Sequence, residues 1–180
     1  MLTIIVPARE SFDPITETFF ETKEQKLELE HSLLSIAKWE SKWGKAFLDK
    51  NTQKTVEESR DYIRCMTITQ NVKPETYYAL TDDNYREIAE YMEAPMTATW
   101  INTSNQSPSR EIVTAEVLYY YMVALQIPFT CEKWHFNRLI TLIRVCSEKN
   151  KPPKKMGRKA IMTQNQALNA ARRAMTGSKG

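Results

Sequence analysis

The stretch REIVTAEVLYYYMVALQIPFTCEKWHFNRLITLIRVCSEK, residues Arg110–Lys149, decides the fold. Its first part, Arg110–Gln126, is apolar around most of the circumference of a helix, which predicts burial against several other elements. Pro128 separates it from Glu132–Lys149, in which apolar residues recur at the spacing of a helix face. That face consists of Trp134, Phe136, Leu139, Ile140, Leu142, Ile143, Val145 and Cys146. We expect these two helices to form the centre of the core.

Three shorter helices are expected on the N-terminal side, over Ser32–Gly44, Thr55–Ile68 and Thr81–Glu93. Each begins with a Ser or Thr side chain that accepts a hydrogen bond from the first turn. In the second helix, a Glu three residues after the Thr completes a capping box. The first helix ends at a Gly, the residue that most readily adopts the left-handed backbone of a helix C-terminus.

The N-terminal residues predict a small β element. Leu2–Val6 is a short β-branched run and is expected to form a strand. Apolar and charged residues alternate in Thr18–Thr22 and again in Leu27–Leu29, so these two runs are expected to pair as a hairpin. Met96–Ile101 alternates weakly and is a further candidate for a short strand.

Charge is distributed unevenly along the sequence. Lys149–Gly180 holds nine Lys and Arg residues and no Asp or Glu, which leaves 16 basic (25 − 9) and 22 acidic residues in the first 148. Pro152 and Pro153 interrupt any helix, and Ala160–Met175 places Ile161, Ala167, Leu168, Ala171 and Met175 on one side of a possible helix. The tail is therefore expected to remain solvated, to bind nucleic acid through phosphates, or to fold on a protein partner.

The sequence thus predicts a mainly α protein. Residues 1–150 are expected to form a compact helical domain with a small N-terminal β-hairpin element, and residues 151–180 a basic, partly disordered tail. No window reaches the roughly 20 apolar residues of a membrane-spanning helix. The first ten residues lack the basic start of a secretory signal. We expect a cytoplasmic protein without a membrane partner.

Residues with catalytic chemistry are sparse. The two histidines, His31 and His135, have no recognisable partners in the sequence, and four glycines are too few for a phosphate-binding loop. The spacing of Cys65, Cys131 and Cys146 matches neither a zinc site nor a disulfide framework, so reduced thiols packed in apolar segments are expected. The sequence predicts no enzyme activity, no metal and no cofactor.

Two groups of residues are candidates for binding a partner. Trp39 and Trp43 lie four residues apart on one helix face, where they either pack on neighbouring helices or form an aromatic interface patch. In the tail the candidates are Leu168, Arg172 and Arg173. Consecutive tyrosines at 119–121 point in three directions on a helix, so at least one is expected to be exposed or to meet another element.

The protein also resembles a known family in a series of strings that occur in order along nearly its whole length. They are LEHSLLSIAKWESKW (Leu29–Trp43), DYIRCMTI (Asp61–Ile68), APMTATW (Ala94–Trp100), CEKWHFNRLITLIRVC (Cys131–Cys146), PPKKM (Pro152–Met156) and ALNAARR (Ala167–Arg173). In these strings the protein resembles the tail assembly chaperones of long-tailed bacteriophages and related prophages.

The resemblance implies a non-catalytic protein of the host cytoplasm. Such a protein would bind the long, apolar tape measure protein and help tail tube subunits to assemble around it, with the tail tube protein as a second candidate partner. Two alternatives stay open: a nucleic-acid-binding accessory protein that acts through the basic tail, and a structural neck or tail component of the virion. The sequence does not decide whether the protein forms a homo-oligomer.

Overall fold

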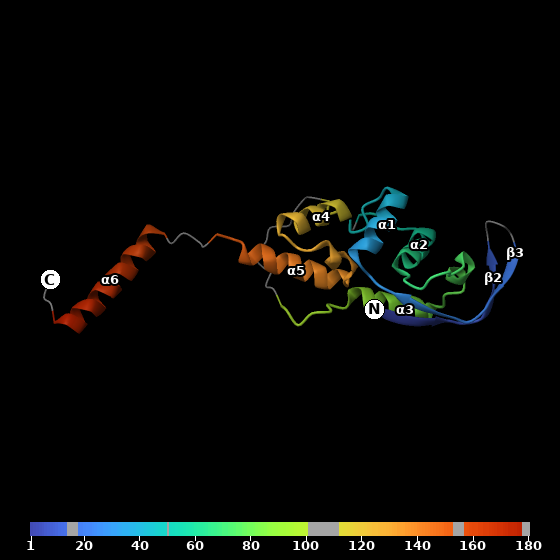
Figure 1. Ribbon diagram of the computed structural model, residues 1–180, viewed down its shortest axis with the longest axis horizontal. Coiled ribbons are helices and arrows are strands. Elements are labelled where there is room, and N and C mark those ends of the chain that lie inside the picture. The colour runs from blue at the N-terminus through green and yellow to red at the C-terminus, as the bar shows by residue number, and fades with distance from the viewer. Residues whose placement is uncertain (14–17, 50, 101–111, 153–156, 178–180) are drawn as a thin grey trace. The chain divides into compact units, whose positions relative to one another are not determined.

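The protein is mainly α-helical, and its described residues also form two small two-stranded sheets (Figure 1). The computed structural model describes residues 1–13, 18–49, 51–100, 112–152 and 157–177. The protein divides into two units, Met1–Lys149 and Asn150–Gly180.

The strands of the first unit pair as β1 with β4 and β2 with β3. Strand β1 (Leu2–Val6) is antiparallel to β4 (Gln25–Leu29), and β2 (Arg9–Asp13) is antiparallel to β3 (Thr18–Thr22). The predicted strand at residues 2–6 is confirmed, but the predicted pairing of residues 18–22 with 27–29 is wrong. The observed register aligns Ile4 with Leu27, and one face of the β1–β4 pair is buried. The β1–β4 pairing therefore buries apolar side chains of both strands in the core, namely Ile4, Val6, Leu27 and Leu29.

Helices α1 (Leu33–Trp43) and α2 (Val56–Met66) pack against each other. Ser32 caps α1 and Thr55 caps α2, each through a capping box, and Gly44 ends α1 with a left-handed backbone (φ 62°). The N-termini of both helices and the C-terminus of α1 therefore agree with the sequence prediction. Each cap satisfies backbone N–H groups of the first turn that would otherwise lack an acceptor.

Helix α3 (Asp82–Glu93) contacts strand β1. Thr81 caps it, as predicted, and Asn84 in its first turn donates a hydrogen bond of 3.1 Å to the backbone oxygen of Ile5. A 3₁₀-helix, η1 (Pro74–Tyr78), lies between α2 and α3 in sequence and contacts α2. Residues 96–100 form no strand, and Ile101 lies outside the described residues.

The two helices expected at the centre are shorter than predicted. Helix α4 spans Ala115–Ala124, and α5 spans Phe136–Lys149, with the 3₁₀-helix η2 (Phe129–Lys133) between them. The start predicted for the first of these helices, Arg110, lies outside the described residues. The second begins after the predicted Glu132, because the backbone N–H of Phe136 bonds to the oxygen of His31 (2.7 Å) and ties the start of α5 to the start of α1.

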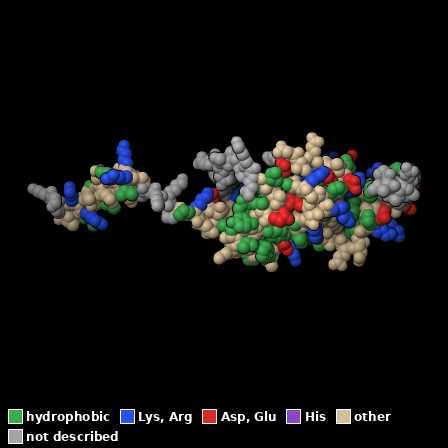
Figure 2. All heavy atoms as spheres, turned by 90° about the horizontal axis from the view of Figure 1, so that it is seen from above, with side chains coloured by type: hydrophobic (Ala, Val, Ile, Leu, Met, Phe, Trp, Pro, Cys, Tyr) green, Lys and Arg blue, Asp and Glu red, His purple; other side chains and the backbone are tan. Residues whose placement is uncertain are grey.

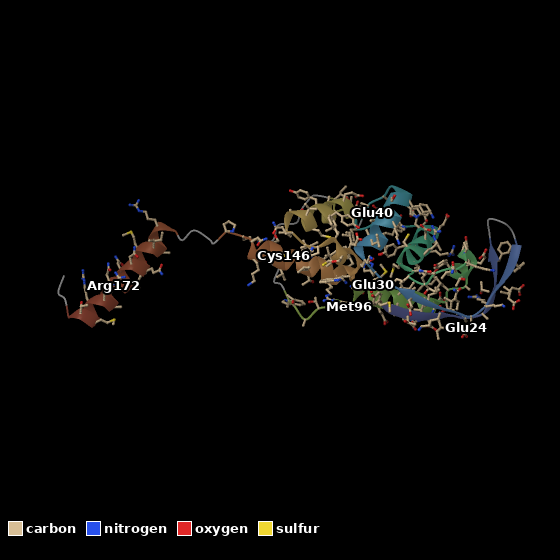
Figure 3. All side chains as sticks on the ribbon, viewed as in Figure 1. Glu24, Glu30, Glu40, Met96, Cys146 and Arg172 are labelled. Carbon is tan, nitrogen blue, oxygen red and sulfur yellow. The ribbon has the colours of Figure 1, made fainter. Side chains whose placement is uncertain are left out.

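A buried carboxylate joins α1 to α4. Glu40, labelled in Figure 3, accepts hydrogen bonds from the backbone N–H groups of Phe47 (2.7 Å) and Ala115 (2.7 Å). A carboxylate that accepts two backbone donors satisfies groups from two separate parts of the sequence. Glu40 thereby fixes where α4 begins relative to α1.

The second unit contains helix α6, Arg158–Thr176. It begins after Gly157 and ends at Gly177, whose backbone is left-handed (φ 66°). The side chains of α6 are all exposed. The possible helix that the sequence predicted over Ala160–Met175 is present and spans Arg158–Thr176.

Candidate partner-binding surfaces

Helix α4 is apolar on its buried face and on much of its exposed face. It buries Ala115, Leu118 and Met122 in the core. On the other side, Tyr120 is 67% exposed and Val123 is 61% exposed. The prediction that at least one of the consecutive tyrosines is exposed is confirmed. Helix α4 contacts α1 and, through the rings of Tyr119 and Phe129, η2, but only part of its circumference meets the core.

The exposed side of α4 continues onto η2. Phe129 is 56% exposed, and its ring centroid lies 6.1 Å from that of Tyr119. The Tyr119 hydroxyl donates a hydrogen bond of 2.8 Å to Glu132. Burial, together with this bond, raises the pKa of Tyr119, so the hydroxyl stays protonated and the ring stays oriented at neutral pH.

We call Tyr119, Tyr120, Val123 and Phe129 the α4 surface. Hydrophobic side chains gather in this region of the first unit in Figure 2, and Glu116 is the single charged residue in α4. Aromatic residues that are exposed together mark sites of contact with other proteins more often than scattered apolar residues do. The α4 surface is therefore the strongest candidate for a protein-binding site on the first unit.

The tryptophans named from the sequence serve mainly in packing. Trp39 is 0% exposed, and its indole nitrogen donates to the backbone oxygen of Glu58 (2.8 Å). Trp43 is partly buried and donates to the carboxylate of Asp61 (2.9 Å). The sequence left two alternatives for the two tryptophans, packing on neighbouring helices or an interface patch. Trp39 packs on neighbouring helices and has no exposed surface for a partner. Trp43 keeps only part of its side chain exposed.

The tail candidates Leu168, Arg172 and Arg173 all lie exposed on α6, where Figure 3 labels Arg172. At about 100° per residue, seven of the nine apolar residues of α6 fall on one arc that only Gln164 interrupts, while Met162 and Ala170 lie outside it. The arc consists of Ala160, Ile161, Ala167, Leu168, Ala171, Ala174 and Met175. Leu168 lies on this arc, and the two arginines lie beside and opposite it, so α6 is a basic amphipathic helix.

The two histidines lie together in the core. Their ring centroids are 5.4 Å apart, and Nδ1 of His31 forms a hydrogen bond of 2.5 Å with the Tyr62 hydroxyl. Nε2 of His135 lies 3.0 Å from the backbone oxygen of Tyr91. Burial lowers the pKa of both rings, that of His31 to about 3, so both are neutral at pH 7. The pair links α1, α2, α3 and α5.

The cysteines are free thiols, with Cys131 buried and the other two partly buried. In the part of the protein that the structure describes, no three His, Cys, Asp or Glu side chains gather as ligands for a metal ion. No helix among the described residues is long and apolar enough to cross a lipid bilayer.

Comparison of the sequence and structure with models of protein families, with curated proteins and with solved structures found no match.

One feature of the sequence pointed to the α4 surface, although the sequence prediction did not use it. Residues 115–124 carry one charge, so an amphipathic pattern is absent and no face of the helix is marked as solvated. A helix of that composition is either enclosed by the core or partly covered by another molecule. The sequence prediction considered the first outcome alone, and the core covers only one side.

Proposed function

We propose that this protein is a phage tail assembly chaperone that binds the tape measure protein in the host cytoplasm without catalysis. The ordered resemblance from Leu29 to Arg173 supports this proposal. The observation that carries it is the α4 surface, an exposed aromatic and aliphatic patch on a unit with excess acidic charge. An apolar, aggregation-prone helical client needs such a patch to dock on, and the acidic charge keeps the complex soluble.

The α4 surface fits the apolar side of a client helix. Tyr120 and Val123 project from adjacent turns of α4, and Phe129 extends the patch onto η2. Helices with apolar residues at intervals of three and four positions bind to surfaces of this kind. Tyrosine rings tolerate a range of client side chains, because they combine a large apolar face with a polar hydroxyl.

Co-expression tests this proposal. The protein is produced together with the tape measure protein from the same genome, and the soluble fraction of the tape measure protein is measured with and without it. The proposal expects a clear rise in that fraction and co-purification of the two proteins. If the protein is folded and soluble but the tape measure protein stays insoluble and does not co-purify, the proposal is wrong.

The basic second unit favours an alternative function, nucleic-acid binding. Residues 150–180 carry eight basic and no acidic side chains, four of them on α6. Phosphate contacts made by such residues weaken steeply with salt. DNA binding with that salt dependence, lost when the protein is truncated after Lys149, would favour this alternative. The second unit contains no aromatic residue, so the stacking found in single-strand binding proteins has no basis here.

A structural neck or tail component is the other alternative. A chaperone leaves the particle after assembly, whereas a structural component stays in it. Mass spectrometry of purified virions separates the two roles, and the chaperone proposal expects this protein to be absent from them.

A further inference from the structure

A narrow cleft lies where α1, α2 and η1 meet, away from the residues of the α4 surface. Its volume is about 160 Å³, and the residues that line it include three cations, Lys42, Arg60 and Arg64. Tyr77 and Tyr78 of η1 contribute aromatic walls. Ligand sites for drug-sized molecules occupy roughly 300–1,000 Å³, so this cleft has room for a single functional group.

One of the two acidic residues in the cleft is already fully engaged. Asp61 accepts hydrogen bonds from Lys42 (2.8 Å), from Arg64 (2.9 Å) and from the indole of Trp43 (2.9 Å). Burial alone would raise the pKa of Asp61, but the bonds from Lys42 and Trp43 and the nearby positive charges lower it. Asp61 is thus held as a carboxylate and has little capacity for a further cation.

Among the described residues, Arg60 is the cation of the cleft that forms no ion pair. Its guanidinium carbon lies 4.2 Å from the centroid of the Tyr78 ring, which holds the planar group in place. Its Nε is buried and has no hydrogen-bond acceptor within the part of the protein that the structure describes. Buried donors in native proteins are nearly always satisfied, so a donor of this kind calls for an explanation. Leaving a buried polar group without a partner costs stability. The two Nη atoms of the same guanidinium carry four further N–H donors, to which an anion in the cleft can bind.

We propose that this cleft binds one carboxylate group of a protein partner, with Arg60 as its main ligand and Arg64 and Lys42 beside it. A guanidinium matches a carboxylate in shape and can donate two parallel hydrogen bonds to it. The ring of Tyr78 fixes the plane of the guanidinium before binding, which reduces the loss of side-chain freedom.

The charges around the cleft favour a carboxylate over a run of nucleic-acid phosphates. Glu57 also lines the cleft, so two carboxylates stand against three cations there, and the net charge of +1 balances one monoanion. A polyanion would meet Glu57 and Asp61 at close range and be repelled. The inference does not depend on the chaperone proposal, because the cleft shares no residue with the α4 surface.

The test is a titration of the full-length protein, followed by the NMR signal of the Arg60 Nε–H group. Two probes carry a carboxylate: the N-methylamide of N-acetylglutamate, which mimics an acidic side group, and N-acetylalanine, which mimics the carboxylate at a protein C-terminus. The N-methylamide of N-acetylglutamine is the neutral control of matched shape, and inorganic phosphate is the competing oxyanion. We expect saturable binding of at least one carboxylate probe with a Kd on the order of 1 mM. The probe that binds more tightly shows whether the partner's carboxylate belongs to an acidic side chain or to a C-terminus.

The matched variants are Arg60→Lys and Arg138→Lys, and their binding is followed by the backbone amide signals of the cleft residues Asp61 and Tyr78, because R60K has no guanidinium Nε–H group. Arg138 also lies 4.2 Å above an aromatic ring, that of Trp134, so R138K loses the same type of stacked guanidinium outside the cleft. R60K is expected to weaken binding about tenfold or more, because Lys retains the charge but not the paired donors, while R138K leaves it unchanged.

The proposal would be overturned by equal shifts with the glutamine probe, by tighter binding of phosphate than of either carboxylate, or by no loss of binding in R60K. Absence of saturation for both carboxylate probes up to tens of millimolar would do so as well. If R60K does not fold, the titration of the wild-type Arg60 signal decides the matter alone.

Discussion

His31 shows how a buried titratable side chain makes stability depend on pH. Its ring is neutral in the folded protein, because burial and the neighbouring His135 lower its pKa from 6.5 to about 3. In the unfolded protein the ring takes up a proton once the pH falls below its ordinary pKa. Stability is therefore complete above pH 6.5 and is lost as the pH falls from there towards 3.

We predict that this pH dependence can be measured in the free energy of unfolding. As the pH falls from 6.5 to 5, the neutral His31 ring should make the free energy of unfolding fall by up to about 1.4 kcal/mol per pH unit. His31→Asn should lower stability at pH 7.5 and also flatten the dependence, since one titrating ring is gone. Urea unfolding at several pH values measures both effects. A slope as steep as that of the wild type would show that His31 does not cause it.

The two tryptophans of α1 provide a second prediction. Trp39→Phe removes a buried hydrogen bond and leaves a cavity, so it should cost about 1–3 kcal/mol of unfolding free energy. Trp43→Phe should cost about 1 kcal/mol or less, because Asp61 keeps its bonds from Lys42 and Arg64. Chemical denaturation of both variants checks the order. A larger loss for W43F would contradict the packing described for Trp39.

At the scale of elements, Glu40 joins α1 to the start of α4. Glu40→Ala leaves the N–H groups of Phe47 and Ala115 without their acceptor and should destabilise the protein by about 2–4 kcal/mol. Glu40→Gln should cost less, since its amide oxygen still satisfies one donor. The exposed Glu87→Ala on α3 is the control, expected within about 0.5 kcal/mol of wild type by thermal unfolding. If E40A and E87A were equally stable, Glu40 would not be the residue that joins α1 to α4.

The elements also show what the sequence could predict. Ser32, Thr55 and Thr81 cap helices as expected, because capping depends on residues three positions apart. Strand pairing was predicted wrongly, because the partner of β4 lies about twenty residues away and is selected by burial of both strands on the core. The start of α5 was misplaced for a related reason: a hydrogen bond to His31 determines it, and local sequence does not contain that contact.

For the whole molecule, the core lies entirely in the first unit. The buried hydrophobic residues run from Ile4 to Ile143, and none lies in α6. A protein ending at Lys149 should therefore unfold within about 2 °C of the full-length protein in circular dichroism. A fall of many degrees would mean that residues 150–180 contribute to the stability of the first unit.

The candidate site was predicted less well than the fold class. The sequence led to Trp39, whose role is packing, and to Leu168, Arg172 and Arg173, which are exposed on α6 but whose role as binding residues stays a prediction. The α4 surface was hidden from sequence reasoning because an all-apolar helix does not indicate which side the core covers. Arg60 was hidden too. It forms no ion pair among the described residues, and the sequence does not show that Lys42 of α1 and Arg64 of α2 both bind Asp61 instead.

The most direct test of whether the α4 surface binds the tape measure protein compares the same substitution at two exposed valines during co-expression with that protein. Val123 on the α4 surface is 61% exposed, and Val56 at the start of α2 is 73% exposed, so Val123→Glu and Val56→Glu are matched variants. We predict that V56E keeps the tape measure protein soluble like the wild type, while V123E, equally folded, loses at least most of that effect. Equal solubility with both variants would contradict the claim that the α4 surface binds the client.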